Sequence, residues 1–241
     1  TEIFLISAKQ QEHYTQSYQT ETNRFHLLPP GIDKDRLRNE SATATRQHLR
    51  AKHQVADDDI ILLMIGSGFK TKGVDRSIRA LAALPDALRA RCQLWVIGKD
   101  EPAAFATLAK TLNISEKVSF LGAKDNVPAY LLAADLLLHP SYHENTGTVI
   151  LEALAAGLPV LTVAACGYAF YVEQAQAGIV LAAPFKQQEW NQLLLNTLTQ
   201  NQLKQLGDNG FNFAKQADIY HLPEKAADLI EKIGGQRAII S

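Results

Sequence analysis

A chain of 241 residues, of which 46% are hydrophobic and 20% charged, has the composition of a folded globular protein. Its net charge of −1 shows no basic excess of the kind that nucleic-acid-binding proteins carry, so we expect no nucleic acid as a partner. Two cysteines, Cys92 and Cys166, do not make a disulfide framework and favour a reducing compartment, the cytoplasm.

The beginning of the chain is predicted to form a short segment with its own boundary. A strand at 3–6, a polar helix at 8–18 and a strand at 24–28 precede "PPGID" (29–33), whose prolines and glycine stop regular structure. The chain starts without an initiator methionine or a signal-peptide pattern, which predicts a fragment that begins inside a strand. The apolar runs, such as 60–65, are far shorter than the roughly 20 residues that a membrane-spanning helix needs.

From residue 35 onward, predicted helices and strands alternate. Strands are predicted at 60–65, 93–97, 117–121, 135–139, 159–163 and 178–182, and helices at 35–53, 74–91, 102–112, 126–133, 148–157, 186–215 and 223–233. This alternation predicts an α/β fold with a doubly wound parallel sheet of the Rossmann type, because parallel strands that are covered on both faces are apolar throughout. Ligands bind such sheets beyond the carboxyl ends of the strands, so the loops that follow the strands are the candidate sites.

The loop "GSGFKTKG", which follows the strand at 60–65, combines glycines with lysines. Glycines let the backbone approach a ligand closely, and lysines beside the start of a helix favour an anion. The pattern is neither a P-loop nor a dinucleotide fingerprint, because it lacks both GK[ST] and the third glycine of GxGxxG. It predicts a phosphate site, with a flexible turn and two solvated lysines as the alternative. The residues of this candidate site are Gly66, Ser67, Gly68, Lys70, Lys72 and Gly73.

Two glutamates lie eight residues apart, Glu144 before a predicted helix and Glu152 inside it. The N–H groups at the start of that helix form a second candidate anion site, and Asn145 or Thr146 could cap the helix. Carboxylates beside a phosphate make sense if they accept hydrogen bonds from sugar or ribose hydroxyls. The pattern therefore predicts a nucleotide-sugar site, with two ordinary surface glutamates as the alternative. The amides in question belong to Asn145, Thr146, Gly147 and Thr148.

Other residues suggest metal chemistry that we do not predict. His139 and His143 have a spacing that suits zinc, but Pro140 prevents the helix that would align them. We predict instead that His139 ends a strand with a satisfied hydrogen bond. Two D-x-D patterns, at 33–35 and 57–59, are interpreted as solvated turns. No metal site and no cofactor are therefore predicted.

Several motifs resemble the donor-binding domain of retaining glycosyltransferases of the GT-B type: the paired glutamates, "GLPVL" after them, and "KG" at 72–73. More specifically, "GVDRSI", "ADLLLHPSYHE", "VILEALAAGLPVL" and "CGYAFYV", with "LPPGID" upstream and "LPEKAADLI" downstream, are similar to lipopolysaccharide-core glucosyltransferases. The similarity extends over essentially the whole chain. It implies that 1–29 is the tail of a truncated N-terminal acceptor-binding domain, 30–220 the nucleotide-sugar-binding domain, and 221–241 a C-terminal helix that can cross back to the N-terminal domain.

The resemblance also implies a role for each candidate residue. Lys72 would contact the diphosphate with support from the amides of 145–148, and Glu144 would hold hydroxyls of the donor sugar. These two are the expected catalytic residues. Glu152 would bind the ribose, and Lys124, in the loop "GAKDN", would lie near the uracil; a solvated turn is the alternative for that loop.

One position departs from the family pattern. The family usually has an arginine before the phosphate-binding lysine, whereas Thr71 stands there in this chain and Lys70 lies one position earlier. A lysine is a point charge without the bidentate fork of a guanidinium, so weaker donor binding would follow. Whether Lys70 replaces the missing charge is left open.

The implied activity is transfer of glucose from UDP-glucose to a heptose of the lipopolysaccharide core, with retention of configuration and without a metal. The complete enzyme would be cytoplasmic and peripheral to the inner membrane. No residue is an obvious nucleophile; Cys166 has no base nearby in the sequence and is interpreted as a packed thiol. Alternatives are a UDP-sugar epimerase of the same fold, a nucleotide-sugar-binding module without turnover, or a transferase with another hexose or acceptor.

Overall fold

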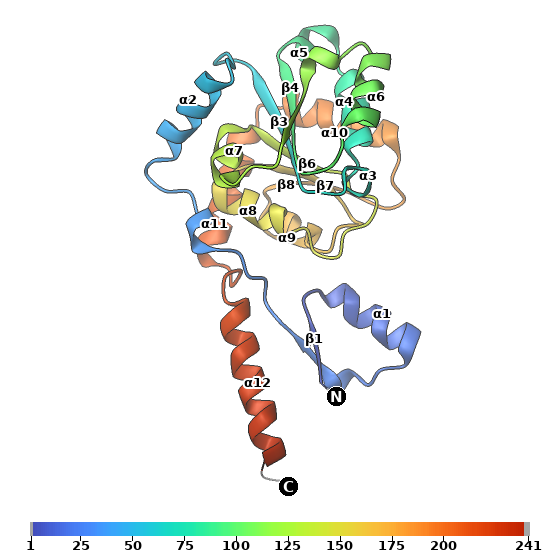
Figure 1. The fold of residues 1–241 in the computed structure, drawn as a ribbon, viewed down its shortest axis with the longest axis vertical. Helices are drawn as coiled ribbons and strands as arrows, with labels where there is room; N and C mark the ends of the chain where they lie inside the picture. The colour runs from blue at the N-terminus through green and yellow to red at the C-terminus, as the bar shows by residue number, and fades with distance from the viewer. Residues whose placement is uncertain (1, 239–241) are drawn as a thin grey trace. The chain divides into compact units, whose positions relative to one another are not determined.

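The computed structural model describes residues 2–238 of the chain. Residue 1 of the predicted segment 1–29 and residues 239–241 of the predicted segment 221–241 lie outside the described residues. The chain divides into two compact units, one built from its two ends and the other from Arg36–Lys215. The larger unit contains the parallel sheet and is shown with its helices in Figure 1.

The sheet of the larger unit has six strands in the order β5-β4-β3-β6-β7-β8, and every neighbouring pair is parallel. Going outward from the centre, β3 is followed by β4 and β5 on one side, while β6 is followed by β7 and β8 on the other. The predicted doubly wound parallel sheet is thereby confirmed. The strands are β3 (Ile60–Ile65), β4 (Cys92–Ile97), β5 (Val118–Gly122), β6 (Leu136–His139), β7 (Val160–Val163) and β8 (Gly178–Leu181).

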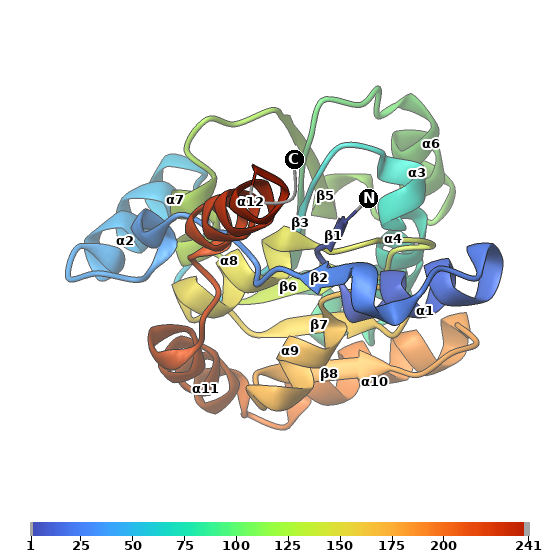
Figure 2. The ribbon, with the colours of Figure 1, turned by 90° about the horizontal axis from the view of Figure 1, so that it is seen from below.

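Helices cover both faces of this sheet, which explains why its strands are apolar throughout. On one face, Leu62 and Met64 of β3 belong to a buried cluster with Ile78 and Trp190 from the covering helices. On the other face, Trp95 of β4 packs against the rings of Tyr130, from a covering helix, and of His53, which directly follows another. Figure 2 shows α4 and α6 on one side of the strands and α2 and α7 on the other.

The helices match their predicted bounds less closely than the strands do. The helices of the larger unit are α2 (Ala42–Lys52), α3 (Phe69–Lys72), α4 (Val74–Ala82), α5 (Asp86–Ala90), α6 (Ala103–Thr111), α7 (Val127–Ala133), α8 (Thr148–Ala156), α9 (Ala169–Gln174), α10 (Gln187–Thr199) and α11 (Leu203–Gln216). Short 3-10 turns lie at Lys34–Arg36 and Ser115–Lys117.

Four predicted helices are wrong in extent, and one of them, predicted at 223–233, runs from Leu222 to Ala238. The helix predicted at 35–53 begins only at Ala42, because residues 34–36 form a 3-10 turn. The helix predicted at 74–91 breaks before Pro85, which lacks an N–H to continue α4 and instead precedes α5. The segment 186–215 is two helices, separated at Asn201 with a positive φ of 51°.

Two short helices were not predicted. α3 lies inside the glycine-rich loop, where Phe69 is only 2% exposed and anchors one turn to the core. α9 follows β7 and buries Val172 completely. Neither is long enough to show the apolar periodicity on which the helix predictions rest.

The smaller unit contains β1 (Ile3–Leu5), α1 (Ala8–Tyr18), a 3-10 turn at Thr22–Arg24, β2 (Phe25–Leu27) and α12 (Leu222–Ala238). β1 and β2 form a two-stranded parallel sheet. The amide of Ile32 donates a hydrogen bond to the carbonyl of Ile219 over 3.0 Å, so the two ends of the chain are joined within this unit.

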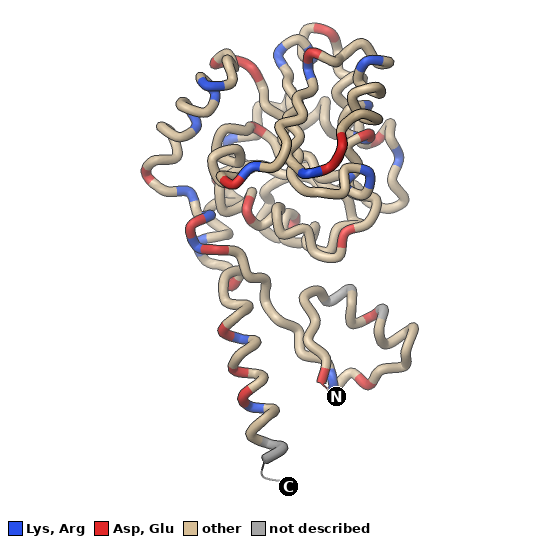
Figure 3. Tube along the Cα trace, in the orientation of Figure 1, with Lys and Arg blue, Asp and Glu red and all other residues tan. Residues whose placement is uncertain are grey.

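Charged residues are spread along the chain rather than gathered in one stretch. Figure 3 shows lysines and arginines interspersed with aspartates and glutamates over the larger unit. Among the described residues, no helix combines the length and the apolar character that crossing a membrane requires.

Candidate functional site

The centre of the sheet brings two predicted loops together. β3 and β6 are hydrogen-bonded neighbours, yet the chain leaves β3 toward β4 on one side and leaves β6 toward β7 on the other. The loops that follow two such strands diverge and leave a crevice between them, which is where open α/β sheets bind ligands. These loops carry Lys72 and Glu144.

Lys72 and Glu144, which are 72 residues apart in the sequence, meet in this crevice. The ammonium group of Lys72 donates a hydrogen bond to Oε2 of Glu144, and both side chains are largely buried. Nε2 of His139, at the end of β6, lies 3.6 Å from the same Glu144 oxygen. The structure thus joins the two residues that were predicted to be catalytic into one charged cluster.

The cluster fixes the ionisation state of Glu144. The neighbouring His139 and Lys72 lower the pKa of the Glu144 carboxyl to about 2 and outweigh desolvation, which acts in the opposite direction. A carboxylate that stays ionised can accept hydrogen bonds from hydroxyl groups at every pH at which the protein works.

This low pKa predicts how acid affects stability. Between pH 4.5, the ordinary value of the carboxyl, and about pH 2, unfolded Glu144 binds more protons than folded Glu144. Stability therefore rises with pH across that window, and Glu144 contributes on the order of 3 kcal/mol that is lost as the pH falls through it. We expect Glu144→Gln to flatten the dependence of the free energy of unfolding on pH in that window.

Denaturant unfolding at several pH values would measure this slope. The exposed Glu173 supplies the control, because Glu173→Gln should leave the wild-type slope intact. Equal slopes for wild type and Glu144→Gln would contradict the low pKa.

The glycine-rich loop is built so that the Lys72 side chain can cross it. Gly66 has φ of +134°, and a Cβ atom at this position would lie 3.0 Å from Cε of Lys72. The amide of Gly68 donates a hydrogen bond to Oδ2 of Asp100 over 2.6 Å, and the amide of Lys99 donates to Oγ of Ser67 over 3.3 Å. The loop after β4 therefore holds the loop after β3 in place.

Arg76 connects the two loops of the crevice. Its guanidinium donates hydrogen bonds to the carbonyls of Pro140 and Ser141 over 2.9 and 3.1 Å. It also lies 3.5 Å from the centre of the Tyr142 ring and 3.7 Å from that of Phe185. These contacts from α4 fix the loop that carries Glu144, although nothing in the sequence pattern alone singled out Arg76.

The start of α8 differs from the predicted cap. Gly147, with φ of +84°, is the N-cap residue, and no side chain caps the helix. The prediction that Asn145 or Thr146 caps it is wrong, because the left-handed turn at Gly147 separates both residues from the helix. The carbonyl of Thr146 instead accepts hydrogen bonds from the amide of Tyr168 and from Sγ of Cys166. Thr148 begins the helix, so its amide and that of Val149 are first-turn donors without a partner inside α8.

Glu152 lies beside Arg36, a partner that the sequence did not indicate. Its Oε1 lies 3.5 Å from Nε of Arg36, and both side chains are mostly buried. A buried carboxylate with an arginine beside it is a positioned group rather than an ordinary surface glutamate.

Lys70 and Lys124, two of the predicted site residues, do not join this cluster. The prediction made for His139 is wrong. Lys70 is exposed on α3, and Lys124 is half-buried in the loop after β5. His139 is 1% exposed, but its Nε2 has no hydrogen-bond partner, contrary to the prediction of a satisfied histidine. The sequence could not show this, because the ring faces residues of other segments.

Within the part of the chain that the structure describes, no group of three or more His, Cys, Asp or Glu side chains is arranged to hold a metal ion. Cys166 is buried and donates to a backbone carbonyl, as expected of a packed thiol.

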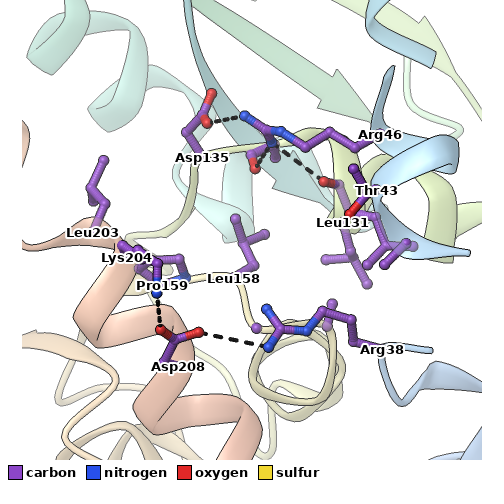
Figure 4. A pocket seen from close by; sticks show the side chains of 15 residues that line it. Arg38, Thr43, Arg46, Leu131, Asp135, Leu158, Pro159, Leu203, Lys204 and Asp208 are labelled. Carbon is purple, nitrogen blue, oxygen red and sulfur yellow. Dashed lines mark hydrogen bonds and ion pairs between the residues drawn. The ribbon is translucent and has the colours of Figure 1, made fainter. Parts of the chain in front are cut away.

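A cavity of about 360 Å³ lies at the opposite edge of the sheet, beside the residues that precede β6 and β7. Figure 4 shows that its charged side chains pair with one another: Arg46 with Asp135, and Asp208 with both Arg38 and Lys204. We therefore place the candidate site at the carboxyl edge, where Lys72 and Glu144 meet, and not in this cavity.

The sequence profile of the family described as "Glycosyl transferases group 1" matches residues 45–213. The chain belongs to this family. The match spans the whole sheet and both loops of the crevice, and it confirms the family resemblance that the motifs carry.

Individual proteins of known name or structure are also similar to this chain. Lipopolysaccharide glucosyltransferase WaaG of Escherichia coli (strain K12) is 45% identical over 231 residues, which cover 95% of this chain and 62% of that protein. The crystal structure of WaaG, a glycosyltransferase involved in lipopolysaccharide biosynthesis, matches 95% of this chain and 62% of its own with a TM-score of 0.92. Anabaena HepE in complex with UDP-glucose shares the fold at 20% identity, with a TM-score of 0.82 over 96% of this chain and 64% of its own. The chain thus spans less than two thirds of each of these proteins.

Proposed function

We propose that this chain is the donor-binding part of a retaining, metal-independent glycosyltransferase that moves glucose from UDP-glucose to a heptose of the lipopolysaccharide core. The observation that carries the proposal is the meeting of Lys72 and Glu144 at the centre of the sheet, in a chain that is 45% identical to WaaG. A lysine and an ionised glutamate in one crevice suit a ligand with both phosphates and hydroxyls.

The basic groups of the crevice bind the diphosphate. Lys72 supplies a positive charge, and the first-turn amides of Thr148 and Val149 supply hydrogen-bond donors at the positive end of the α8 dipole. Lys70 is exposed nearby on α3 and adds a weaker, solvated charge. Gly66 and Gly147 let the backbone approach the donor closely, and Ser67 lies next to Gly66 in the same loop.

The carboxylates bind hydroxyl groups. Glu144, held ionised, accepts hydrogen bonds from the donor sugar, while Glu152, oriented by Arg36, accepts them from the ribose. Lys124 lies at the uracil, with Asn145, Thr146 and Thr148 along the remaining edge of the donor. A protein of the same fold, Anabaena HepE, was solved with UDP-glucose, which supports this class of ligand.

Transfer breaks the bond between the anomeric carbon and the diphosphate oxygen, and a bond to the acceptor oxygen forms on the same face. The acceptor proton goes to the departing diphosphate. Negative charge grows on that diphosphate in the transition state, and Lys72 with the α8 amides stabilises it.

The proposal includes a domain assignment for the chain, whose match covers 62% of WaaG. In this proposal residues 1–29 belong to an N-terminal acceptor-binding domain, residues 30–220 bind the donor, and the helix of 221–241 returns to the N-terminal domain. The acceptor, growing lipopolysaccharide, places the enzyme in the cytoplasm at the surface of the inner membrane.

The test is calorimetric titration of the chain with UDP and with UDP-glucose, with EDTA present to remove divalent metal. We expect metal-independent binding that Glu152→Ala weakens at least tenfold for both ligands, because the ribose is common to them. Glu116→Ala, an exposed glutamate at the other edge of the sheet, serves as the matched control. Binding that Glu152→Ala leaves unchanged would refute the ribose assignment.

Incubation with UDP-glucose alone separates the alternatives. An epimerised product would support an epimerase and overturn the transferase. If the full-length protein binds UDP-glucose yet transfers no sugar to a heptose-containing acceptor, the binding-module alternative holds.

A further inference from the structure

His139 is buried at the end of β6, and its ring nitrogen Nε2 forms no hydrogen bond in this structure. The residue is 1% exposed, and a buried ring nitrogen without a hydrogen-bond partner is unusual. The backbone of the residue is fixed, since its carbonyl accepts a hydrogen bond from Oγ1 of Thr162 over 3.0 Å. The strand therefore fixes the backbone from which the ring projects, and a buried nitrogen left unpaired is unfavourable in this state.

The free nitrogen faces the candidate site. Oε2 of Glu144 lies 3.6 Å from Nε2 of His139, just beyond hydrogen-bond distance. A Cβ atom on Gly147 would lie 3.5 Å from the same nitrogen, at ordinary van der Waals distance, so the ring nitrogen lies directly beside the loop that leads from Glu144 into α8. Glu144 can close the remaining gap by a movement of less than about 1 Å, since hydrogen bonds of this kind span about 2.7–3.2 Å.

The same Glu144 oxygen is occupied by Lys72 in this structure. The proposed function requires Lys72 to bind the diphosphate, and a carboxylate that loses this partner in a largely buried site needs another donor. His139 stands where such a donor is needed.

We infer that His139 is a positioning residue that receives Glu144 when donor binding draws Lys72 to the diphosphate. Nε2–H of His139 then donates to Glu144 Oε2, and the other carboxylate oxygen is aimed at the hydroxyls of the donor sugar. Lys72 and His139 thus exchange as partners of one carboxylate. This inference rests on the proposed function and adds a residue for sugar recognition.

Two substitutions of His139 separate this role from simple packing. The side-chain amide of glutamine places its nitrogen close to the Nε2 position, whereas that of asparagine reaches only the Nδ1 position. We expect His139→Asn to weaken UDP-glucose binding at least tenfold and UDP binding by a smaller factor, because the diphosphate of both ligands draws Lys72 away but only UDP-glucose carries a hexose for Glu144 to hold. His139→Gln should stay within threefold of wild type for both ligands.

Titration of the chain with UDP and UDP-glucose measures both affinities, and thermal unfolding shows whether each variant is folded. An unchanged ratio of the UDP-glucose and UDP affinities in folded His139→Asn would overturn the inference while leaving the proposed function intact. If the wild-type protein bound neither UDP nor UDP-glucose, both the inference and the proposed function would be refuted.

Wild-type protein provides a test that no folding defect can affect. In ¹⁵N NMR of the histidine rings, saturating UDP-glucose should move the Nε2 signal of His139 to that of a protonated, hydrogen-bonded nitrogen. The signal is assigned by its loss in His139→Gln. A signal that is unchanged by UDP-glucose would overturn the inference.

Discussion

Replacing Lys72 by alanine is expected to lower the rate of sugar transfer by about 100- to 1,000-fold, the range seen when a group that stabilises developing charge is removed. Lys72 is the lysine that the structure places against Glu144 in the crevice between β3 and β6. Its loss removes charge from the leaving diphosphate and also leaves the Glu144 carboxylate without its ion-pair partner. The effect should appear in kcat, measured with the full-length protein, UDP-glucose and a heptose-containing acceptor.

Two further lysines sharpen this experiment. Lys110→Ala removes an exposed lysine from α6 and should leave the rate within twofold of wild type. Lys70→Ala decides whether Lys70 replaces the arginine of the family pattern; because Lys70 is exposed to solvent, we expect a loss of less than tenfold. A Lys72→Ala enzyme within threefold of wild type would show that other groups stabilise the leaving group.

The sheet was predictable because each strand is short, apolar throughout and followed by a turn. The strands observed at Ile60–Ile65 and Leu136–His139 lie within a residue of their predicted bounds. The helix predicted at 74–91 is interrupted at Pro85: the apolar spacing continues through this residue, but proline lacks the N–H that a continuous helix needs. Short helices such as α3 depend on one buried side chain and leave no periodic signal.

The site was predictable in its residue types but not in its pairing. Glycines, lysines and glutamates in loops after strands indicated Lys72 and Glu144 separately. Their contact depends on β3 and β6 being neighbours, which strand order alone along the chain does not reveal. For the same reason Arg36, which lies 3.5 Å from Glu152, could not be found by reading one segment at a time.

Gly73→Ala is expected to lower the free energy of unfolding by about 3 kcal/mol or more, from backbone strain and overpacking together. Gly73 has φ of +75°, and a Cβ atom there would lie 2.2 Å from the carbonyl oxygen of Pro140. The loops of Gly73 and Pro140 cannot easily move apart. Arg76 donates a hydrogen bond to the carbonyl of Pro140, and the amide of Tyr142 donates to the carbonyl of Thr71 over 2.8 Å. Denaturant unfolding monitored by circular dichroism measures the loss.

Gly122 offers a control with the same backbone strain and no clash. Its φ is +69°, but a Cβ atom there would meet nothing within 4 Å, so Gly122→Ala should cost only about 1–2 kcal/mol. The difference between the two variants isolates the contact of Gly73 with Pro140. Because that contact joins the loops of Lys72 and Glu144, Gly73→Ala should also weaken UDP-glucose binding under conditions in which it stays folded. Equal destabilisation by the two substitutions would mean that the Pro140 loop moves freely, and the crevice would then lack the rigid geometry on which the Lys72–Glu144 pair depends.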